Sequence, residues 1–288
     1  MESNIEKFIP KVKFELIPIK DLTSTQNYQR NISMKHVERA AANFNPYQIN
    51  PVKVSRRNGY NYVFNGQHTI EIVAMASGSR ETPVWCMVYE ELDYEQEADI
   101  FANQLKYTKA LMPYEIFVAN IEAGNDKELL INDIVNSYNL KISPTKVPGG
   151  ICAVAALEYI LDEFGCDILD RTLRVIIGTW EGINDSMSAN MLKGVSIVLY
   201  AYGSLFNEEI FKEKLGRIPP KILIRNAKDR GNGAAGFSEA MVIEYNKKMK
   251  GGSLPIGKID EAMRHKRKSR KERQQDMFEL LNQIKAEE

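Results

Sequence analysis

The sequence predicts an α+β protein in which a mixed N-terminal domain precedes an all-helical one. Up to residue 90, short alternating apolar runs typical of strands are interleaved with helical stretches. From residue 92 onward the apolar spacing is almost purely helical and is punctuated by glycines. After residue 250 the chain becomes rich in basic residues. We therefore expect domains at residues 1–110 and 111–249, followed by a basic C-terminal segment at 250–288 that forms a helix.

Length and composition agree with a globular protein of about two domains. The chain has 288 residues, of which 44% are hydrophobic and 26% charged, which excludes a disordered chain or a disulfide-stabilised miniature protein. Its three cysteines lie in apolar stretches without the spacing of metal ligands, so we expect buried, reduced thiols at Cys86, Cys152 and Cys166. Without an apolar stretch long enough to cross a bilayer, the expected location is cytoplasmic, with no membrane partner.

The first predicted elements of the N-terminal domain are a strand and a helix. Residues 14–19 read as a strand interrupted by Pro18, and Ser33 is the expected N-cap of a helix over residues 34–44, with Val37 and Phe44 on one face. Two alternating apolar runs then flank Asn58 and Gly59. This dipeptide tolerates the positive φ angles of a type I′ turn, so the pattern predicts a β-hairpin.

The hairpin leads into the remaining elements of this domain. Residues 65–67 form a tight connection into a helix that ends at Gly78, and a strand follows at residues 84–89. Asp93 and Gln96 have the spacing of a capping box at the start of the next helix. Pro113 is suited to the first position of the helix that opens the second domain.

The second domain is predicted to be helical throughout. The apolar spacing gives helices at about residues 126–138, 150–164, 168–180, 186–202, 207–215 and 219–230. Residues 131–159 make a poor helix-turn-helix candidate, because their turn is far longer than three or four residues. In the last of these helices Lys221, Arg225 and Lys228 share one face, which would suit a DNA surface but is more often merely solvated.

The most informative stretch is the strand-turn-helix at residues 62–73. A glycine between a strand and a helix permits close approach of a ligand, and the free N–H groups of the helix start favour an anion. Phosphate is the natural occupant, and the side chains of Gln67, His68 and Thr69 are candidate donors. Such a glycine is also ordinary turn chemistry, so this motif alone is weak.

The order of motifs over residues 14–123 resembles the ParB/sulfiredoxin-like superfamily. The corresponding motifs are residues 19–22, 27–30, 65–69 and 103–115. Asn-Gly-Gln-His at residues 65–68 is similar to the Asp-Gly-Gln-His-Arg variant found in ParB-like proteins of phages and other mobile elements. The resemblance implies a ParB/sulfiredoxin-like N-terminal fold.

The resemblance also implies a phosphate site for CTP or ATP, in some relatives with magnesium. Its candidate residues in this chain are Arg30, Asn65, Gly66, Gln67, His68 and Thr69. Thr69 stands where the family motif has an arginine, and Asn65 where it often has an acidic residue. These changes remove a bidentate phosphate donor and a magnesium ligand, so the nucleotide site is expected to be partly degenerate and no metal ligand is assigned.

Enzymatic alternatives centre on the Asn-Gly-Gln-His-Thr motif at residues 65–69, hereafter the box. If the protein is an enzyme, His68 and Glu71 are the candidate catalytic residues of a nuclease or a nucleotide-dependent phosphotransferase. Sulfiredoxin chemistry would need a cysteine where Gln67 stands. A nuclease would need carboxylates converging on a metal, whereas the acidic residues between Asp93 and Asp99 look like a helix N-terminus. The expectation therefore leans toward a protein without catalytic activity.

The net charge of zero, from 38 basic and 38 acidic residues, conceals a basic C-terminal segment. Residues 264–273 contain seven cations and one anion, and such a run favours phosphate contacts without sequence preference. The candidate DNA-binding residues are Arg264, Lys266, Arg267, Lys268, Arg270, Lys271 and Arg273. Apolar residues from Met277 to Ile284 share a helix face that would pack on the body or on another subunit, so a homo-oligomer is a candidate assembly. We predict a ParB-like, DNA-associated binding protein.

Overall fold

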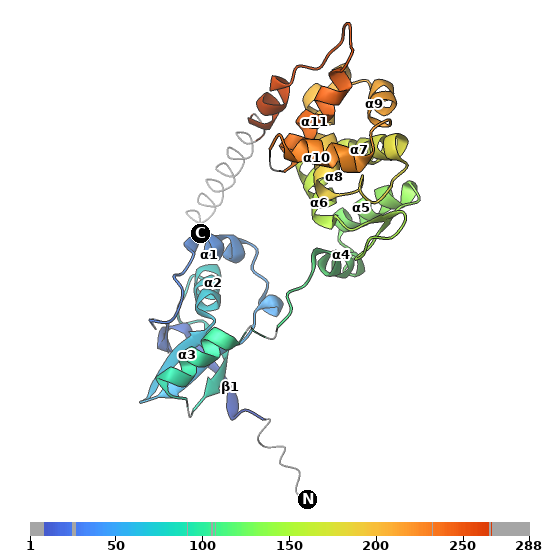
Figure 1. Ribbon diagram of the computed structural model, residues 1–288. Coiled ribbons are helices and arrows are strands. Elements are labelled where there is room, and N and C mark those ends of the chain that lie inside the picture. The colour runs from blue at the N-terminus through green and yellow to red at the C-terminus, as the bar shows by residue number, and fades with distance from the viewer. Residues whose placement is uncertain are drawn as a thin grey trace, which may run out of the picture. The chain divides into compact units, whose positions relative to one another are not determined.

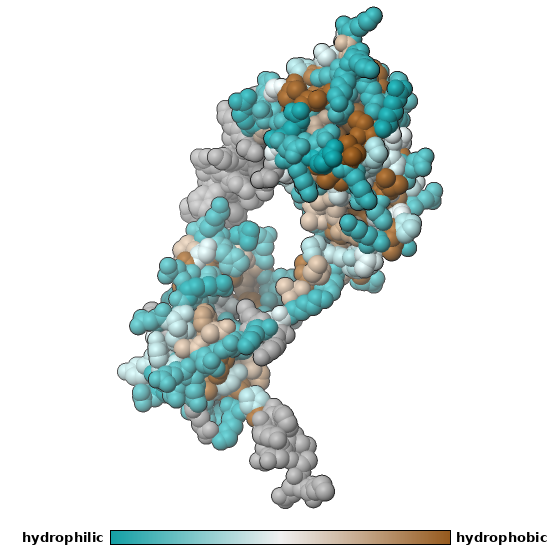
Figure 2. Space-filling model, viewed as in Figure 1, coloured by the Kyte–Doolittle hydropathy of each residue, from teal (hydrophilic) through white to brown (hydrophobic). Residues whose placement is uncertain are grey.

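The computed structural model describes residues 9–24, 27–90, 92–104, 106, 108–231, 233–264 and 266. The chain forms two compact units, residues 1–110 and 111–288, each with its own elements (Figure 1). On the face shown in Figure 2, hydrophobic residues are scattered among hydrophilic ones in both units. The predicted α+β class is confirmed. No helix among the described residues is long and apolar enough to cross a membrane.

A five-stranded mixed sheet forms the centre of the first unit, in the order β1-β5-β3-β4-β2. Its strands are β1 (Val12–Pro18), β2 (Leu22–Thr23), β3 (Val52–Arg57), β4 (Tyr60–Asn65) and β5 (Pro83–Tyr89). Its helices are α1 (Met34–Ala42), α2 (Gln67–Ser77) and α3 (Tyr94–Asn103), and 3-10 turns lie at Ile19–Asp21 and Pro46–Gln48. β1 pairs antiparallel with β5, β3 is parallel to β5 and antiparallel to β4, and β2 is parallel to β4.

The hairpin between β3 and β4 forms as predicted. Asn58 and Gly59 both have positive φ angles, of 53° and 77°, as a type I′ turn requires. Arg57 pairs with Tyr60 directly across this turn. The capping box at α3 is also present, with Asp93 accepting from the Gln96 N–H and the Gln96 side chain accepting from the Asp93 N–H.

The two faces of the sheet have different coverings. Val54, Val63, Val84 and Cys86 lie on one face and pack with Ile70 of α2 in a buried cluster. Strand alternation turns Arg57, Tyr62 and Trp85 to the opposite face. α3 covers the β3 and β4 side of that face, where its Glu97 contacts Arg57. The part formed by β1 and β5 keeps large side chains exposed: Phe14 61%, Leu16 52% and Trp85 56%.

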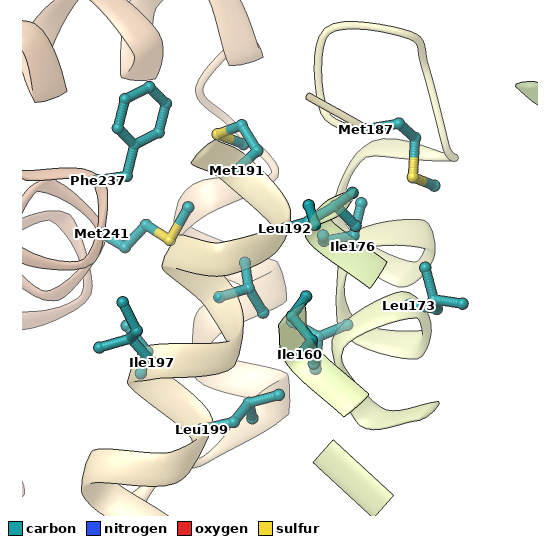
Figure 3. Packing of buried hydrophobic residues seen from close by; sticks show 14 of the residues in the cluster. Ile160, Leu173, Ile176, Met187, Met191, Leu192, Ile197, Leu199, Phe237 and Met241 are labelled. Carbon is teal, nitrogen blue, oxygen red and sulfur yellow. The ribbon is translucent and has the colours of Figure 1, made fainter. Parts of the chain in front are cut away.

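The second unit consists almost entirely of helices. They are α4 (Pro113–Glu122), α5 (Asp126–Ser137), α6 (Val154–Phe164), α7 (Cys166–Trp180), α8 (Ala189–Tyr202), α9 (Glu208–Leu215), α10 (Pro220–Lys228) and α11 (Ala234–Asn246), with a 3-10 turn at Gly203–Leu205. α8 runs through the core (Figure 3). There Met191 and Ile197 lie toward Phe237 and Met241 of α11, and Leu192 lies toward Ile160 and Ile176.

Three features of the second unit differ from the sequence expectations. α11 was not predicted, and it is buried over most of its surface. A two-stranded parallel sheet, β6 (Lys141–Ile142) and β7 (Gly150–Ile151), lies between α5 and α6. It separates the two helices of the poor helix-turn-helix candidate. Residues 250–264 do not stand apart, because Leu254 and Ile259 are buried in the core of this unit.

Two side-chain expectations were also wrong. Cys86 is buried, but Cys152 and Cys166 are exposed, because the second and third thiols lie just before a helix and at a helix start rather than inside the core. In α1 only Val37 is buried, and Phe44 beyond its end is 37% exposed. The helix ends at Ala42, so Phe44 leaves the predicted face.

Candidate functional site

Gly66 joins β4 to α2 in a conformation that few other residues adopt. Its φ angle is +106°, and a Cβ added there would lie 3.2 Å from the Cα and both γ carbons of Val52. The backbone of the box thus packs directly on β3, and the positive φ turns the chain into the helix. The glycine therefore has a structural role that is independent of any ligand.

The N-terminus of α2 is not capped by a side chain. Gly66 occupies the N-cap position without a side-chain hydrogen bond, and the first intrahelical bond runs from the Ile70 N–H to the Gly66 oxygen at 3.1 Å. The N–H groups of Gln67, His68 and Thr69 therefore precede the regular helix bonds. Together with the helix dipole, they favour a negative charge at this end of α2.

Gln67 fastens the loop that carries Arg30. The side chain of Gln67 is buried, and its amide donates to the backbone oxygen of Arg30. In the same loop the Gln29 side chain donates to the Val63 oxygen of β4. Residues 27–30 and the box, which are far apart in the sequence, are thereby held together. Gln67 acts here as a positioning residue, and its amide is already engaged.

Arg30 is exposed, and its positive charge acts on His68 of the box. Its positive charge contributes to lowering the pKa of His68, after the larger effect of burial and ahead of His36. No ion pair or hydrogen bond from another described residue engages the Arg30 guanidinium. An exposed guanidinium near an uncapped helix N-terminus is a suitable arrangement for binding a phosphate group.

His68 connects α2 to α1. Its Nε2 accepts a hydrogen bond of 3.1 Å from the backbone N–H of Ser33, the residue that precedes α1. The ring also meets the His36 ring edge-on at 5.7 Å between centroids. Nε2 can accept only in neutral imidazole, in agreement with the lowered pKa of His68. Since this nitrogen is engaged by the backbone, the arrangement fits a structural contact better than a general base.

Asn65 brings a third segment to the box. Its side-chain amide donates to the Gln104 Oε1 at 2.6 Å, at the C-terminal end of α3. The loop at residues 27–30, the box and the end of α3 therefore converge at one place. Thr69 is half-buried in the first turn of α2, so all the predicted phosphate-site residues lie in this region.

Glu71 forms an ion pair with Arg80. Arg80 donates to both of its carboxylate oxygens at 3.0 to 3.1 Å. The acidic residues of α3 do not converge either, because Asp93 caps the helix and Asp99 accepts from Asn103. Within the described part of the chain no group of three or more histidine, cysteine, aspartate and glutamate side chains is arranged to hold a metal ion.

Glu97 is a buried carboxylate that the sequence placed in the capped first turn of a helix. It is fully buried and accepts from the Arg57 Nε at 2.7 Å and the Tyr28 hydroxyl at 3.2 Å. The Arg57 guanidinium also lies 4.0 Å from the centre of the Tyr62 ring. Burial and the negative Glu97 raise the pKa of the Tyr28 hydroxyl. No spacing signal links these residues, because they come from a loop, a strand and a helix.

The predicted DNA-binding run lies mostly outside the described residues. Arg267, Lys268, Arg270, Lys271 and Arg273 belong to that part. Arg264 is exposed, and its Nε donates to the Asp260 oxygen. The Lys266 side chain is only 12% exposed, because its ammonium lies 3.8 Å from Glu163 and 4.5 Å from the centre of the Phe164 ring. Lys266 therefore packs on α6 rather than pointing freely to solvent.

A second basic surface lies on α10. Lys221, Arg225 and Lys228 are exposed, and Arg230 follows in the next turn and is also exposed. Lys221 lies 4.0 Å from Asp185, while Leu223 and Ala227 on the other side of the helix are buried. α10 thus packs its apolar side on the unit and leaves its basic side to solvent.

Comparison with known families places both units in one family. A family model described as a family of unknown function, DUF6551, matches residues 23–258. The chain belongs to the DUF6551 family. The DUF6551 match covers the box and all helices from α1 to α11, and it ends before the basic run at residues 264–273. No curated protein matches the chain.

Proposed function

We propose that the first unit is a ParB/sulfiredoxin-like domain that binds a phosphate group at the N-terminus of α2. The observation that carries this proposal is an uncapped helix start to which the backbone of the exposed Arg30 is bonded. Gln67 holds the backbone of Arg30 there, and Asn65 holds the end of α3 at the same place. Three of the four segments that the superfamily resemblance singles out are therefore neighbours, which supports the proposal.

The expected ligand is a nucleotide triphosphate, CTP or ATP, with or without magnesium. The backbone N–H groups of Gln67, His68 and Thr69 would receive phosphate oxygens, and Arg30 would supply the charged donor. Thr69, which replaces the arginine of the motif, would contribute only a hydroxyl. Asn65 offers magnesium a neutral amide oxygen in place of a carboxylate, so the ion would have to be coordinated mainly by phosphate and water.

A thermal-shift panel with CTP, ATP and ADP, with and without magnesium, tests the phosphate site. A ligand that binds only the native state raises its apparent stability. We expect stabilisation that is lost in Arg30→Ala and kept in Arg39→Ala, which removes an exposed arginine from α1 of the same unit. Lack of stabilisation by every nucleotide, or equal loss in both variants, would overturn the proposal and leave the box as a structural turn.

We further propose that the chain associates with DNA through basic residues of the second unit. The exposed face of α10, with Lys221, Arg225 and Lys228, supports this for the described residues. Arg264 and the rest of the run to residue 273 supply further cations. Binding of this kind depends on phosphate contacts, so it would be insensitive to sequence and strongly dependent on salt.

Fluorescence anisotropy with duplex DNA over a range of salt concentrations tests this proposal. Replacing Lys221, Arg225 and Lys228 together by alanine should reduce the slope of log affinity against log salt by roughly 3, about one for each lost phosphate contact. A control variant removes the same charge elsewhere on the unit, at Lys141, Lys146 and Arg217, and should leave the slope nearly unchanged. Equal effects of the two variants would show that α10 is not the contact.

Truncation separates the contribution of the C-terminal run. The chain should be truncated after Lys266, because Ile259 is buried and Lys266 packs on α6. Removing residues 267–288 should weaken DNA binding and lower its salt dependence if the run contacts phosphates. Full affinity in the truncated protein would exclude these residues as a DNA contact. The enzymatic alternatives gain no support from Glu71 or His68, whose side chains are engaged by Arg80 and by Ser33.

A further inference from the structure

Strand β1 forms one edge of the five-stranded sheet, with β5 as its neighbour. Pro18 faces Pro83 in the β1 and β5 register. Neither proline has an N–H, so this must be a pair without ladder hydrogen bonds. Alternation along an antiparallel ladder then turns the N–H and C=O groups of Val12, Phe14 and Leu16 toward the free edge. No described strand lies on that side.

The same edge carries an exposed apolar surface. Phe14 and Leu16 are more than half exposed, and Trp85 of β5, directly opposite Leu16, is 56% exposed. An edge strand with unpaired backbone groups and large apolar side chains is a template for pairing with another strand. We propose that β1 pairs antiparallel with β1 of a second copy of this chain, about a two-fold axis at Phe14.

The sequence of β1 is self-complementary in this register. An antiparallel pair centred on Phe14 places Lys13 opposite Glu15 of the second copy, and Glu15 opposite its Lys13. The hydrogen-bonded pairs are then Phe14 with Phe14 and Val12 with Leu16. The Lys13 and Glu15 pairs fall at the intervening positions, where opposed side chains come closest. They would extend the ion pairs that Lys13 forms with Glu90 and Glu15 forms with Arg56 in each chain.

Other registers are unfavourable. Centring the pair on Lys13 or on Glu15 would place two like charges directly opposite each other, which is destabilising. Pro10 and Pro18 lie four residues on either side of Phe14. In the Phe14 register Pro10 lies opposite Pro18 of the second copy, and Pro18 lies opposite its Pro10. The ladder therefore ends at prolines on both sides and leaves no unpaired N–H group there. Charge and proline positions therefore select the same register.

Sedimentation of the full chain tests this interface through Phe14. Because Phe14 is 61% exposed in the single chain, Phe14→Lys should leave the fold intact while placing two ammonium groups opposite each other at the axis. We expect a dimer for the natural sequence and at least a tenfold higher dissociation constant for Phe14→Lys. Tyr47→Lys, at a residue 96% exposed elsewhere on the unit, should leave the dimer unchanged. Circular dichroism confirms that both variants fold.

A crosslinking experiment tests the register itself. In a background with Cys152→Ser and Cys166→Ser, Phe14→Cys should form a disulfide with its copy under mild oxidation, because such paired positions lie about 5.5 Å apart between Cα atoms. Tyr47→Cys should not. A monomer at all concentrations would overturn the proposal, and so would a dimer that Phe14→Lys does not weaken. If only removal of residues 1–8 allows dimerisation, those residues occupy the edge and the proposal is wrong for the full chain.

Discussion

Replacing Gly66 should destabilise the first unit at the turn between β4 and α2. Gly66→Ala would combine a φ of +106° with a Cβ 3.2 Å from Val52, and we expect it to lower the free energy of unfolding by about 3 kcal/mol. Gly78→Ala, at the other end of α2, is the matched control, since its φ is +69° but nothing lies within 4 Å of the added Cβ. It should cost about 1 kcal/mol. Urea denaturation measures both, and equal losses would contradict the packing argument.

His68 should make the first unit sensitive to acid. Burial, with Arg30 and His36, lowers the pKa of His68 in the folded protein. Between the ordinary histidine pKa and this lowered pKa, the unfolded chain therefore binds more protons than the folded protein. Stability therefore rises with pH across this window and is lost on acidification. His68→Gln keeps an acceptor for the Ser33 N–H but does not titrate, so its loss of stability between pH 7.5 and 5.5 should be smaller. Identical slopes for the two proteins in denaturation experiments would rule out this coupling.

At the level of elements, α3 is attached to the sheet by one buried carboxylate. Glu97→Gln would leave Arg57 without its anion, and because that guanidinium is partly exposed, we expect a loss of about 2 kcal/mol rather than the larger cost of a fully buried pair. Glu95→Gln, on the exposed side of the same helix, should change stability by less than about 0.5 kcal/mol. Chemical denaturation compares the two. A similar small effect at both positions would show that Glu97 does not hold α3.

The elements that local sequence predicted are those with local chemical signals. Asn58 and Gly59 fixed the hairpin, Asp93 and Gln96 marked the start of α3, and Pro113 opened α4. α11 was missed for two physical reasons. It follows Gly231 and Gly233, which suggest a loop, and it is buried on nearly all sides, so it has no polar face to produce a helical period.

The candidate site was located by its glycine, but its contacts could not be derived from spacing. Gln67 bonds to the backbone of Arg30, and Asn65 bonds to Gln104. Both bonds join segments nearly 40 residues apart, and only the folded sheet brings such segments together. The ion pair between Glu71 and Arg80 spans only nine residues, from α2 to the loop before β5, and no spacing pattern indicated it either.

At the level of the whole molecule, the two units should unfold as separate transitions, because their buried clusters share no residue. Ile70→Ala should destabilise only the first unit and Leu157→Ala only the second, each by about 2 to 5 kcal/mol. The chain has one tryptophan in each unit, Trp85 and Trp180. Fluorescence of Trp85→Phe and Trp180→Phe proteins therefore follows each unit separately. A single transition lowered by both core substitutions would show that the units are coupled.

The pairing of β1 with β5 also has a consequence for folding during synthesis. Val12 pairs with Tyr89, and Pro18 with Pro83, so the partner of β1 is made roughly 70 residues later. At about 5 to 20 residues per second, the nascent strand waits several seconds for its neighbour. During that interval both edges of β1 are open, and Phe14 and Leu16 have no sheet to join. The sheet closes late, as expected for pairing between distant segments, whereas the helices of the second unit can form as they emerge.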